Sequence, residues 1–240
     1  MVKVIAPNNR VFNCKDFTCP ENYLTELDLS QCPELQTLYC SFHNQLTELN
    51  LSHCPKLRAL YCYSNQFTEL DLSHCPELKI LYCGNNQLTE LDLSHCPKLK
   101  ELVCYNNQLT ELNLSHCSEL RELCCGNNKL SNLDMYHCLK LQELRCRFNQ
   151  LTELDLSHCP ELRQLFCGNN QLTELDLSHC PELQKLECQK NLLEDLNILN
   201  NDKLTDFKWN YNPIDREETN TIEKMKEYYR NNYSCTYVLK

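Results

Sequence analysis

The stretch Leu88-Thr-Glu-Leu-Asp-Leu-Ser-His-Cys-Pro-Lys-Leu-Lys-Glu-Leu-Val-Cys-Tyr-Asn-Asn-Gln108 recurs as near-copies along most of this chain. Full copies begin at Leu24, Leu46, Phe67, Leu88, Leu109, Leu130, Leu151 and Leu172. The first copy is one residue longer, and a degraded ninth copy runs from Leu193 to Pro213. A unit this short cannot bury an apolar face alone, so neighbouring copies must stack and bury it for each other. The repeat therefore predicts a solenoid.

Within each copy, numbered from its first residue, apolar side chains recur at positions 1, 4, 6, 9, 12, 15 and 17. The alternations at positions 4 to 6 and 15 to 17 predict two short strand-like segments per coil, with the residues between pointing outward. Position 20 is Asn in every full copy. We expect this amide to be buried and hydrogen-bonded to the backbone of adjacent coils, because an unpaired buried amide costs about 1 to 3 kcal/mol. Pro at position 10 of six copies indicates a turn.

Twenty cysteines would suggest disulfides or zinc in many chains, but here sixteen of them fall in two columns of the repeat. Position 9 holds Cys32, Cys54, Cys75, Cys96, Cys117, Cys138, Cys159 and Cys180, and position 17 holds Cys40, Cys62, Cys83, Cys104, Cys125, Cys146, Cys167 and Cys188. Free Cys is a small, readily buried hydrophobe, and the parallel Cβ directions of a column suit the disulfide dihedral angle poorly. We expect reduced thiols and a reducing compartment. Zinc sites use close Cys pairs, whereas these spacings alternate between 8 and 13, or 14 after the longer first copy, so no metal site is expected.

The segment Leu99-Lys-Glu-Leu-Val-Cys-Tyr-Asn-Asn-Gln-Leu109 resembles the conserved segment of leucine-rich repeats. The 21-residue unit with a nested Leu-x-x-Leu-Asp-Leu half is similar to the short class called IRREKO repeats. This resemblance implies a leucine-rich-repeat solenoid, a right-handed β/irregular superhelix with a parallel sheet on its concave face, and most often a protein-binding role. Cys instead of Asn at position 9 departs from the commoner pattern and leaves the conformation of the convex side open.

Both ends of the repeat array break the pattern, and solenoid ends need caps. We divide the chain into an N-terminal cap (1–23), the repeats (24–213) and a C-terminal cap (214–240). The first cap is predicted as a hairpin around the turn Pro7-Asn-Asn-Arg10, with apolar residues Val2, Val4, Val11, Phe17 and Cys19.

At the other end, the acidic segment 215–218 predicts the start of a helix over about 215–231, followed by a strand-like segment at 235–239. Trp209 stands where a position-17 Cys would be, and we expect it to plug the last coil.

The bulk composition narrows the classes of partner. The chain carries 23 Lys and Arg against 33 Asp and Glu, for a formal charge of -10. This balance disfavours nucleic acid, because phosphate binding depends on Lys and Arg. No apolar run approaches the ~20 residues of a bilayer span, and residues 1–15 lack the apolar core of a signal peptide. We expect a monomer in the cytoplasm, or in the host cytosol if it is an effector.

Columns that vary between copies are the candidates for recognition, because the fixed columns serve the coil. Positions 14, 16 and 18 vary and should share the exposed face of the conserved-segment strands. The predicted partner-binding residues are Tyr39, Tyr61, Tyr63, Tyr82, Val103, Tyr105, Arg145, Arg147 and Phe166. Exposed Tyr and Arg are enriched in interface hot spots. The alternative is a tyrosine column that only stabilises the sheet, by about 0.2 to 1 kcal/mol per pair.

Three outward columns on the other half of the repeat leave a second interpretation open. Position 3 is mostly Glu and position 5 is Asp or Asn, while position 8 is His in seven copies. These columns are typical of a solvated face, and the alternative is a structural or metal-binding repeat protein. No nucleophile and base break the repeat together, so we predict no enzyme and no cofactor. Cys124 is the one outward Cys of the repeats, and no His unique to its copy accompanies it.

Overall fold

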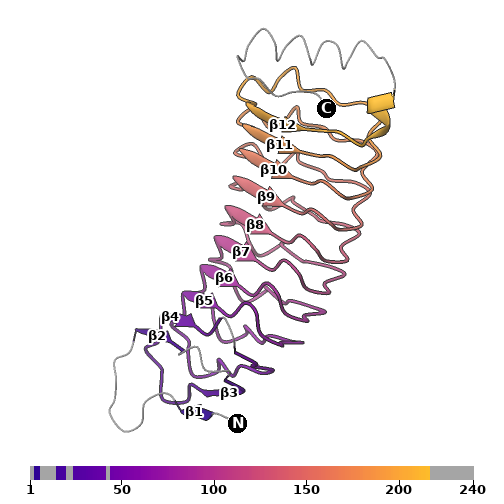
Figure 1. Cartoon of the computed structure of the whole chain (residues 1–240). Coiled ribbons are helices and arrows are strands. Elements are labelled where there is room, and N and C mark those ends of the chain that lie inside the picture. The colour runs from indigo at the N-terminus through magenta and orange to yellow at the C-terminus, as the bar shows by residue number, and fades with distance from the viewer. Residues whose placement is uncertain (1–2, 6–14, 20–23, 42–43, 217–240) are drawn as a thin grey trace.

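The computed structural model describes residues 3–5, 15–19, 24–41 and 44–216. The chain winds into a solenoid whose coils stack along one curved axis (Figure 1). The strands are β1 (Lys3–Ile5), β2 (Asp16–Thr18), β3 (Glu26–Asp28), β4 (Thr37–Tyr39), β5 (Ala59–Tyr61), β6 (Ile80–Tyr82), β7 (Glu101–Val103), β8 (Glu122–Cys124), β9 (Glu143–Arg145), β10 (Gln164–Phe166), β11 (Lys185–Glu187) and β12 (Asp206–Lys208). A short 3-10 helix, η1, spans Pro213–Arg216.

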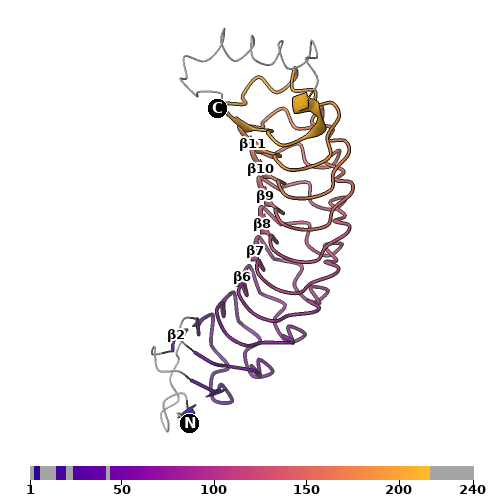
Figure 2. The ribbon, with the colours of Figure 1, turned by 45° about the vertical axis from the view of Figure 1, so that its right-hand side comes forward.

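Strands β4 to β12 come from positions 14 to 16 of successive copies and form one parallel sheet with β2. Each strand pairs with the next in the register of the repeat, so that Leu102 of β7 lies opposite Leu123 of β8. Figure 2 shows this sheet on the inner side of the curve. The predicted solenoid with a parallel concave sheet is confirmed.

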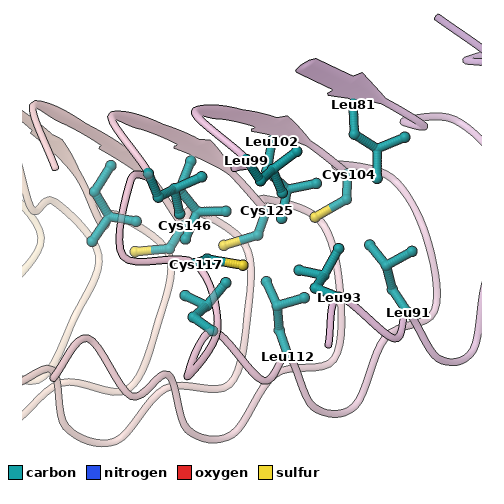
Figure 3. Close-up of a cluster of buried hydrophobic side chains, with 14 of the residues drawn as sticks. Leu81, Leu91, Leu93, Leu99, Leu102, Cys104, Leu112, Cys117, Cys125 and Cys146 are labelled. Carbon is teal, nitrogen blue, oxygen red and sulfur yellow. The ribbon is translucent and has the colours of Figure 1, made fainter. Parts of the chain in front are cut away.

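The core lies between the sheet and the segment formed by positions 3 to 6 of each copy, which we name the outer leg. Figure 3 shows Leu102 and Cys104 entering the core from the strand side, and Leu91, Leu93 and Leu112 entering it from the outer legs. These leucines are at most 7% exposed, and Cys104 is fully buried. Burial of one such leucine side chain contributes about 1.5 to 3 kcal/mol. The inward positions predicted from the apolar columns are confirmed.

Eighteen of the cysteines lie in the described part of the chain, where they form no disulfide bond with one another, and all of them except Cys124 are buried. Burial raises the pKa of the seven position-17 thiols from Cys40 to Cys167, to about 12 at Cys83 and Cys167. A buried thiol that holds its proton is a poor nucleophile. The two columns therefore pack as apolar side chains within the core.

The position-20 asparagines join neighbouring coils. Asn107 accepts a hydrogen bond of 3.0 Å from the Leu88 N–H of its own copy. Its amide donates to the carbonyl of Cys104, at 3.0 Å, and to that of Cys83 in the preceding copy, at 3.1 Å. The same pattern recurs at Asn65, Asn86, Asn128, Asn149, Asn170 and Asn191. The predicted ladder of buried amides is confirmed.

Position 19 makes the tight turn after each strand in a left-handed backbone conformation. Its φ lies between 52° and 63° at Ser64, Asn85, Asn106, Asn127, Phe148, Asn169, Lys190 and Tyr211. Asn tolerates this conformation better than larger side chains do. Phe148, Lys190 and Tyr211 occupy it at a cost in stability.

The outer leg alternates buried and exposed residues as expected, but it forms a strand in only one of the described copies. That strand is β3, which pairs in parallel with β1. In the other described copies the prediction of a second strand was wrong. The inner sheet keeps its strands at ladder spacing, and the longer outer circumference of a curved solenoid spreads the outer legs apart. Instead of a ladder, the chain makes two successive turns, Cys54 N–H to the Leu51 carbonyl and Leu57 N–H to the Cys54 carbonyl.

The described residues do not show the predicted N-terminal hairpin. Strands β1 and β2 do not pair with each other, because β1 lies parallel to β3 and β2 lies parallel to β4. The described residues 3–5 and 15–19 therefore occupy the places of a degenerate first coil. Cys19 lies 21 residues before Cys40, and its N–H bonds the Tyr39 carbonyl as the Cys40 N–H bonds that of Tyr61. The predicted turn at 7–10 lies outside the described residues.

At the C-terminal end, Trp209 packs partly buried against the core. Its ring stacks on Phe207, with centroids 4.6 Å apart. This agrees with its expected place as a plug in the last coil. The predicted helix from residue 217 onward and the strand-like segment at 235–239 lie outside the described residues.

Candidate functional site

The inner face consists of the side chains at positions 14, 16 and 18 on strands β4 to β12 and directly after them. Parallel pairing places equal positions of successive copies side by side. The structure thus brings the predicted residues together in two groups, one over β4 to β7 and one over β9 to β11.

The first group is a file of tyrosines at position 16. The Tyr39 and Tyr61 rings stack with centroids 4.5 Å apart and planes 5° apart. Tyr61 and Tyr82 meet edge to face at 5.0 Å. Val103 follows Tyr82 in the β6–β7 register. Tyr39 is 42% exposed and Tyr61, Tyr82 and Val103 are half-buried, so the file presents aromatic surface to solvent while each ring is held by its neighbour.

The position-18 tyrosines lie beside this file. The ring of Tyr105 lies over Gly84, where an added Cβ would come within 2.9 Å of two ring carbons. Asn85 donates a hydrogen bond of 3.0 Å to the Tyr105 hydroxyl. Burial and the neighbouring Tyr105 raise the pKa of Tyr63. Glycine at position 18 of one copy therefore makes room for a large side chain in the next copy.

Carboxylates at position 14 occupy the middle of the inner face. Glu101, Glu122 and Glu143 lie opposite one another on β7, β8 and β9. Burial, and then repulsion from Glu101 and Glu143, raises the pKa of Glu122. Tyr82 donates a 3.2 Å hydrogen bond to Glu101, and burial together with this carboxylate raises the Tyr82 pKa to about 12. The middle of the face is thus negative beside the aromatic end.

The second group surrounds Phe166. Arg145, Arg147 and Lys185 place their cationic groups 4.5, 4.9 and 5.4 Å from the centroid of its ring. Phe166 is only 4% exposed. We predicted an exposed side chain here, and that was wrong, because long side chains on or directly after the two adjacent strands, β9 and β11, cover the ring. Cation–π contacts of this kind contribute about 0.5 to 2 kcal/mol each.

Four residues that the sequence interpretation left out complete this cluster. Glu187 is 5% exposed and pairs with both Arg147 and, at 3.0 Å, Lys208. Lys185 pairs with Asp206 at 2.8 Å. Asp206 and Lys208 are positions 14 and 16 of the degraded ninth copy, so extending the columns by one copy would have found them.

Cys124 lies on β8, on the inner face between Val103 and Arg145. Burial raises its pKa, and the nearby Arg145 lowers it by less. A thiol held protonated in this way is a weak nucleophile.

The acidic and histidine columns point outward, as predicted. Asp71 accepts a hydrogen bond from the Ser73 N–H, and the Ser94 hydroxyl lies 3.0 Å from Nδ1 of His95. Within the part of the chain that the structure describes, no three His, Cys, Asp or Glu side chains are grouped to hold a metal ion. Nor does that part contain a helix that is long and apolar enough to cross a membrane.

The family profile described as leucine-rich repeats in two copies matches residues 33–74, 55–95, 76–118, 97–137 and 139–179. These matches cover more than half of the chain. The chain belongs to the leucine-rich-repeat family. No curated protein sequence matches this leucine-rich-repeat protein.

Solved structures resemble it along most of its length. The functional domain of InlJ from Listeria monocytogenes, described as including a cysteine ladder, is 34% identical over 82% of this chain and 48% of that one, with a TM-score of 0.68. A leucine-rich-repeat protein of Leptospira interrogans has a TM-score of 0.82 and 24% identity, over 89% of this chain and 58% of that one. The plant peptide hormone receptor RGFR1, solved in complex with RGF2, has a TM-score of 0.67 and 25% identity over 82% of this chain and 34% of that one. This leucine-rich-repeat protein therefore spans between a third and three fifths of the length of these proteins.

Proposed function

We propose that this leucine-rich-repeat protein is a non-catalytic interaction scaffold that binds a protein or peptide on its inner face. The observation that carries the proposal is the in-register file of Tyr39, Tyr61 and Tyr82. Aromatic rings that are fixed by their neighbours and open to solvent lose little entropy on binding, which is why tyrosine recurs at hot spots.

Two further observations support this use of the inner face. Its outward positions differ between copies, whereas the core positions repeat, so the face presents different chemistry along its length. A related structure, the peptide hormone receptor RGFR1, was solved with the ligand RGF2 bound. A monomeric adaptor, inhibitor or bacterial effector would each use such a face.

The test uses two double variants. One carries Tyr61→Ser and Tyr82→Ser on the inner face, and the matched control carries Glu48→Ser and Glu69→Ser on the outer legs of the same two copies. Peptides selected on the wild-type protein from a displayed library are measured on all three proteins by calorimetry. We expect the tyrosine variant to lose at least about tenfold in affinity, or 1.4 kcal/mol, and the outer-leg variant to bind as the wild type. Unchanged binding by a folded tyrosine variant would leave the file a purely structural ladder.

We also propose that the protein works in a reducing compartment, the cytoplasm or a host cytosol. Support comes from the burial of the two Cys columns in the core, where each thiol contributes as an apolar side chain. Mass spectrometry of alkylated thiols in protein prepared without reductant tests this proposal. Disulfides among the column cysteines would contradict it.

A further inference from the structure

The sixth copy, residues 130–150, breaks the repeat on the side away from the inner face. Position 7 is Ser in seven of the full copies, and position 10 is Pro in six. In the sixth copy these positions are Tyr136 and Leu139, and both side chains are more than half exposed, at 59% and 53%. The same copy also replaces the position-3 glutamate by Asn132. Large apolar side chains in place of small turn residues mark this outer turn as different from its neighbours.

The Tyr136 ring is held in place from two coils. It lies 4.3 Å from the His158 ring and 5.0 Å from the His137 ring, centroid to centroid. Its backbone N–H bonds Asp134 at 2.8 Å, as the position-7 serines bond their own position-5 residues. The turn thus keeps the repeat geometry while presenting an oriented aromatic surface.

A groove of about 810 Å³ runs from Tyr136 along the outer legs of the sixth to ninth copies. Its lining includes six carboxylates and neither lysine nor arginine. They are Asp134, Glu153, Asp155, Glu174, Asp176 and Asp195. Hydrogen bonds from Ser157 and Ser178 lower the pKa of Asp155 and Asp176, so these two groups are ionised at neutral pH.

Among the described residues, the groove carboxylates lack the ion pairs that neighbouring side chains of the same copies make. At position 11, Lys98 pairs with Glu77, Lys140 with Glu119, and Lys203 with Glu182. No ion pair between described residues joins any of the six groove carboxylates to a lysine or arginine. An exposed aromatic ring beside uncompensated carboxylates complements a cationic ligand, because the ring face also attracts ammonium and guanidinium groups.

We propose that this groove, with Tyr136 at its sixth-copy end and Leu139 exposed on the same turn, binds a basic peptide segment in which lysine or arginine residues flank an apolar side chain. The carboxylates receive the cations, and the Tyr136–Leu139 turn receives the apolar side chain. The groove does not suit a second copy of this chain, whose net charge is also negative at -10. This site is separate from the inner face.

The probe is a fluorescein-labelled peptide, Gly-Lys-Lys-Leu-Lys-Leu-Lys-Lys-Gly, compared by anisotropy with a form that has Ser for Leu and a form that has Glu for Lys. The main variant is Tyr136→Ser with Leu139→Pro, which restores the Ser and Pro that six other copies carry together and so keeps the fold. We expect the wild type to prefer the Leu peptide over the Ser peptide by about tenfold, and the variant to lose that preference. The Glu peptide should not bind.

Two controls localise the binding. Glu153→Gln with Glu174→Gln, in the groove, should weaken binding of the Leu peptide. Glu69→Gln with Glu90→Gln, at the same repeat positions in earlier copies, should leave it unchanged. The proposal is overturned if the two glutamine double variants lose peptide affinity equally. It is also overturned if the Tyr136→Ser, Leu139→Pro variant binds the Leu peptide with wild-type affinity. A wild-type dimer, seen by sedimentation, that this variant dissociates overturns it as well. The Tyr61→Ser, Tyr82→Ser variant should bind the peptide as the wild type does, so this result stands apart from that of the inner face.

Discussion

Each strand from β4 to β12 turns its middle residue into the core and its two flanking residues onto the inner face. The middle residue is leucine in every strand from β4 to β11 and Phe207 in β12, whereas the flanking residues range from Tyr82 to Arg145. One backbone therefore carries two different constraints. The core side chains must pack against the coils above and below, whereas the inner-face side chains must only be compatible with a β-strand.

Variation alone does not make a side chain available to a partner. At the β4–β6 end of the inner face the rings stack and stay open, and Tyr39 is 42% exposed. At the β9–β12 end, Phe166 and Glu187 occupy position 16, which also varies between copies. Their side chains are nevertheless only 4% and 5% exposed, because cationic side chains cover them. The aromatic end therefore leaves ring surface open to solvent, and the cationic end is a closed cluster of ion and cation–π pairs.

The largest expected difference between core and surface appears at alkaline pH. Burial raises the pKa of the position-17 thiols from the ordinary 9.0 to about 12 at Cys83 and Cys167, and raises that of Cys40, Cys62, Cys104, Cys125 and Cys146 as well. Because the folded pKa is the higher one, the unfolded chain releases protons first. Stability is complete below pH 9 and falls by about 1.4 kcal/mol per buried thiol for each pH unit above it.

Seven such thiols together offset the whole stability of an ordinary domain, about 5 to 15 kcal/mol, within one to two pH units. We expect cooperative unfolding by about pH 10 to 11 under reductant, followed by circular dichroism. Recovery of the spectrum on return to pH 7 is the control for chemical damage. A spectrum unchanged at pH 12 would show that the columns are not buried thiols.

A neighbouring pair of asparagines gives the next largest contrast. Asn107→Ala removes the acceptor of the Leu88 N–H and the donor to the Cys83 and Cys104 carbonyls. We expect a loss of about 3 kcal/mol or more, since each buried group left unpaired costs about 1 to 3 kcal/mol. Asn106→Gly changes the adjacent exposed residue, whose φ of 52° suits glycine, and should cost less than about 1 kcal/mol. Urea unfolding measures both, and equal losses would contradict the ladder.

The repeat positions in the sequence predicted which side chains are buried in the core, but they predicted the exposure of inner-face side chains less well, for a physical reason. Leu102, Cys104 and Asn107 contact the same positions of the adjacent copies, so their environment repeats and can be read from one copy. Phe166 is covered by Arg145 and Lys185, which belong to neighbouring copies with different residues at those positions. Its burial depends on side-chain reach across coils, which periodicity does not encode.

The coil register of the N-terminal segment was not predicted from the sequence, for a related reason. Lys3–Ile5 and Asp16–Thr18 are 13 residues apart, whereas Glu26–Asp28 and Thr37–Tyr39, the strands with which they pair, are 11 apart. This insertion hid the coil register and left a turn signal as the strongest local feature. Phe17 and Cys19, at the positions of Leu38 and Cys40, carried the register that identifies the segment as a coil.

Gly84→Ala tests the packing of the inner face while leaving the buried core positions unchanged. A Cβ at this position would come within 2.9 Å of the Tyr105 ring. The ring must shift and should lose its hydrogen bond from Asn85. We expect a stability loss of about 1 kcal/mol and weaker binding of inner-face ligands, measured by denaturant unfolding and calorimetry. Gly126→Ala, where the nearest atom is the Arg147 carbonyl oxygen at 3.0 Å, serves as the control without an aromatic neighbour.

The smallest expected effect is a gain in stability. Phe148 is 51% exposed and has a φ of 56° at position 19, where most copies carry Asn or Ser. Phe148→Asn should raise the free energy of unfolding by about 0.5 to 1 kcal/mol, because Asn adopts the left-handed conformation at lower cost. Asn127→Phe, the reverse change one copy earlier, should lower it by a similar amount. Thermal unfolding distinguishes the two signs, and a loss for Phe148→Asn would mean that its ring makes a stabilising contact.

The most direct test of the division between a fixed interior and a free inner face is the order in which the described cysteines react with a maleimide. Cys124 and Cys125 are adjacent, but Cys125 is fully buried and Cys124 is partly exposed. Under native conditions at neutral pH, timed labelling followed by peptide mass spectrometry should modify Cys124 well before any cysteine of the two columns, and denaturant should abolish the difference. Column cysteines that label as fast as Cys124 in the native protein would contradict the account.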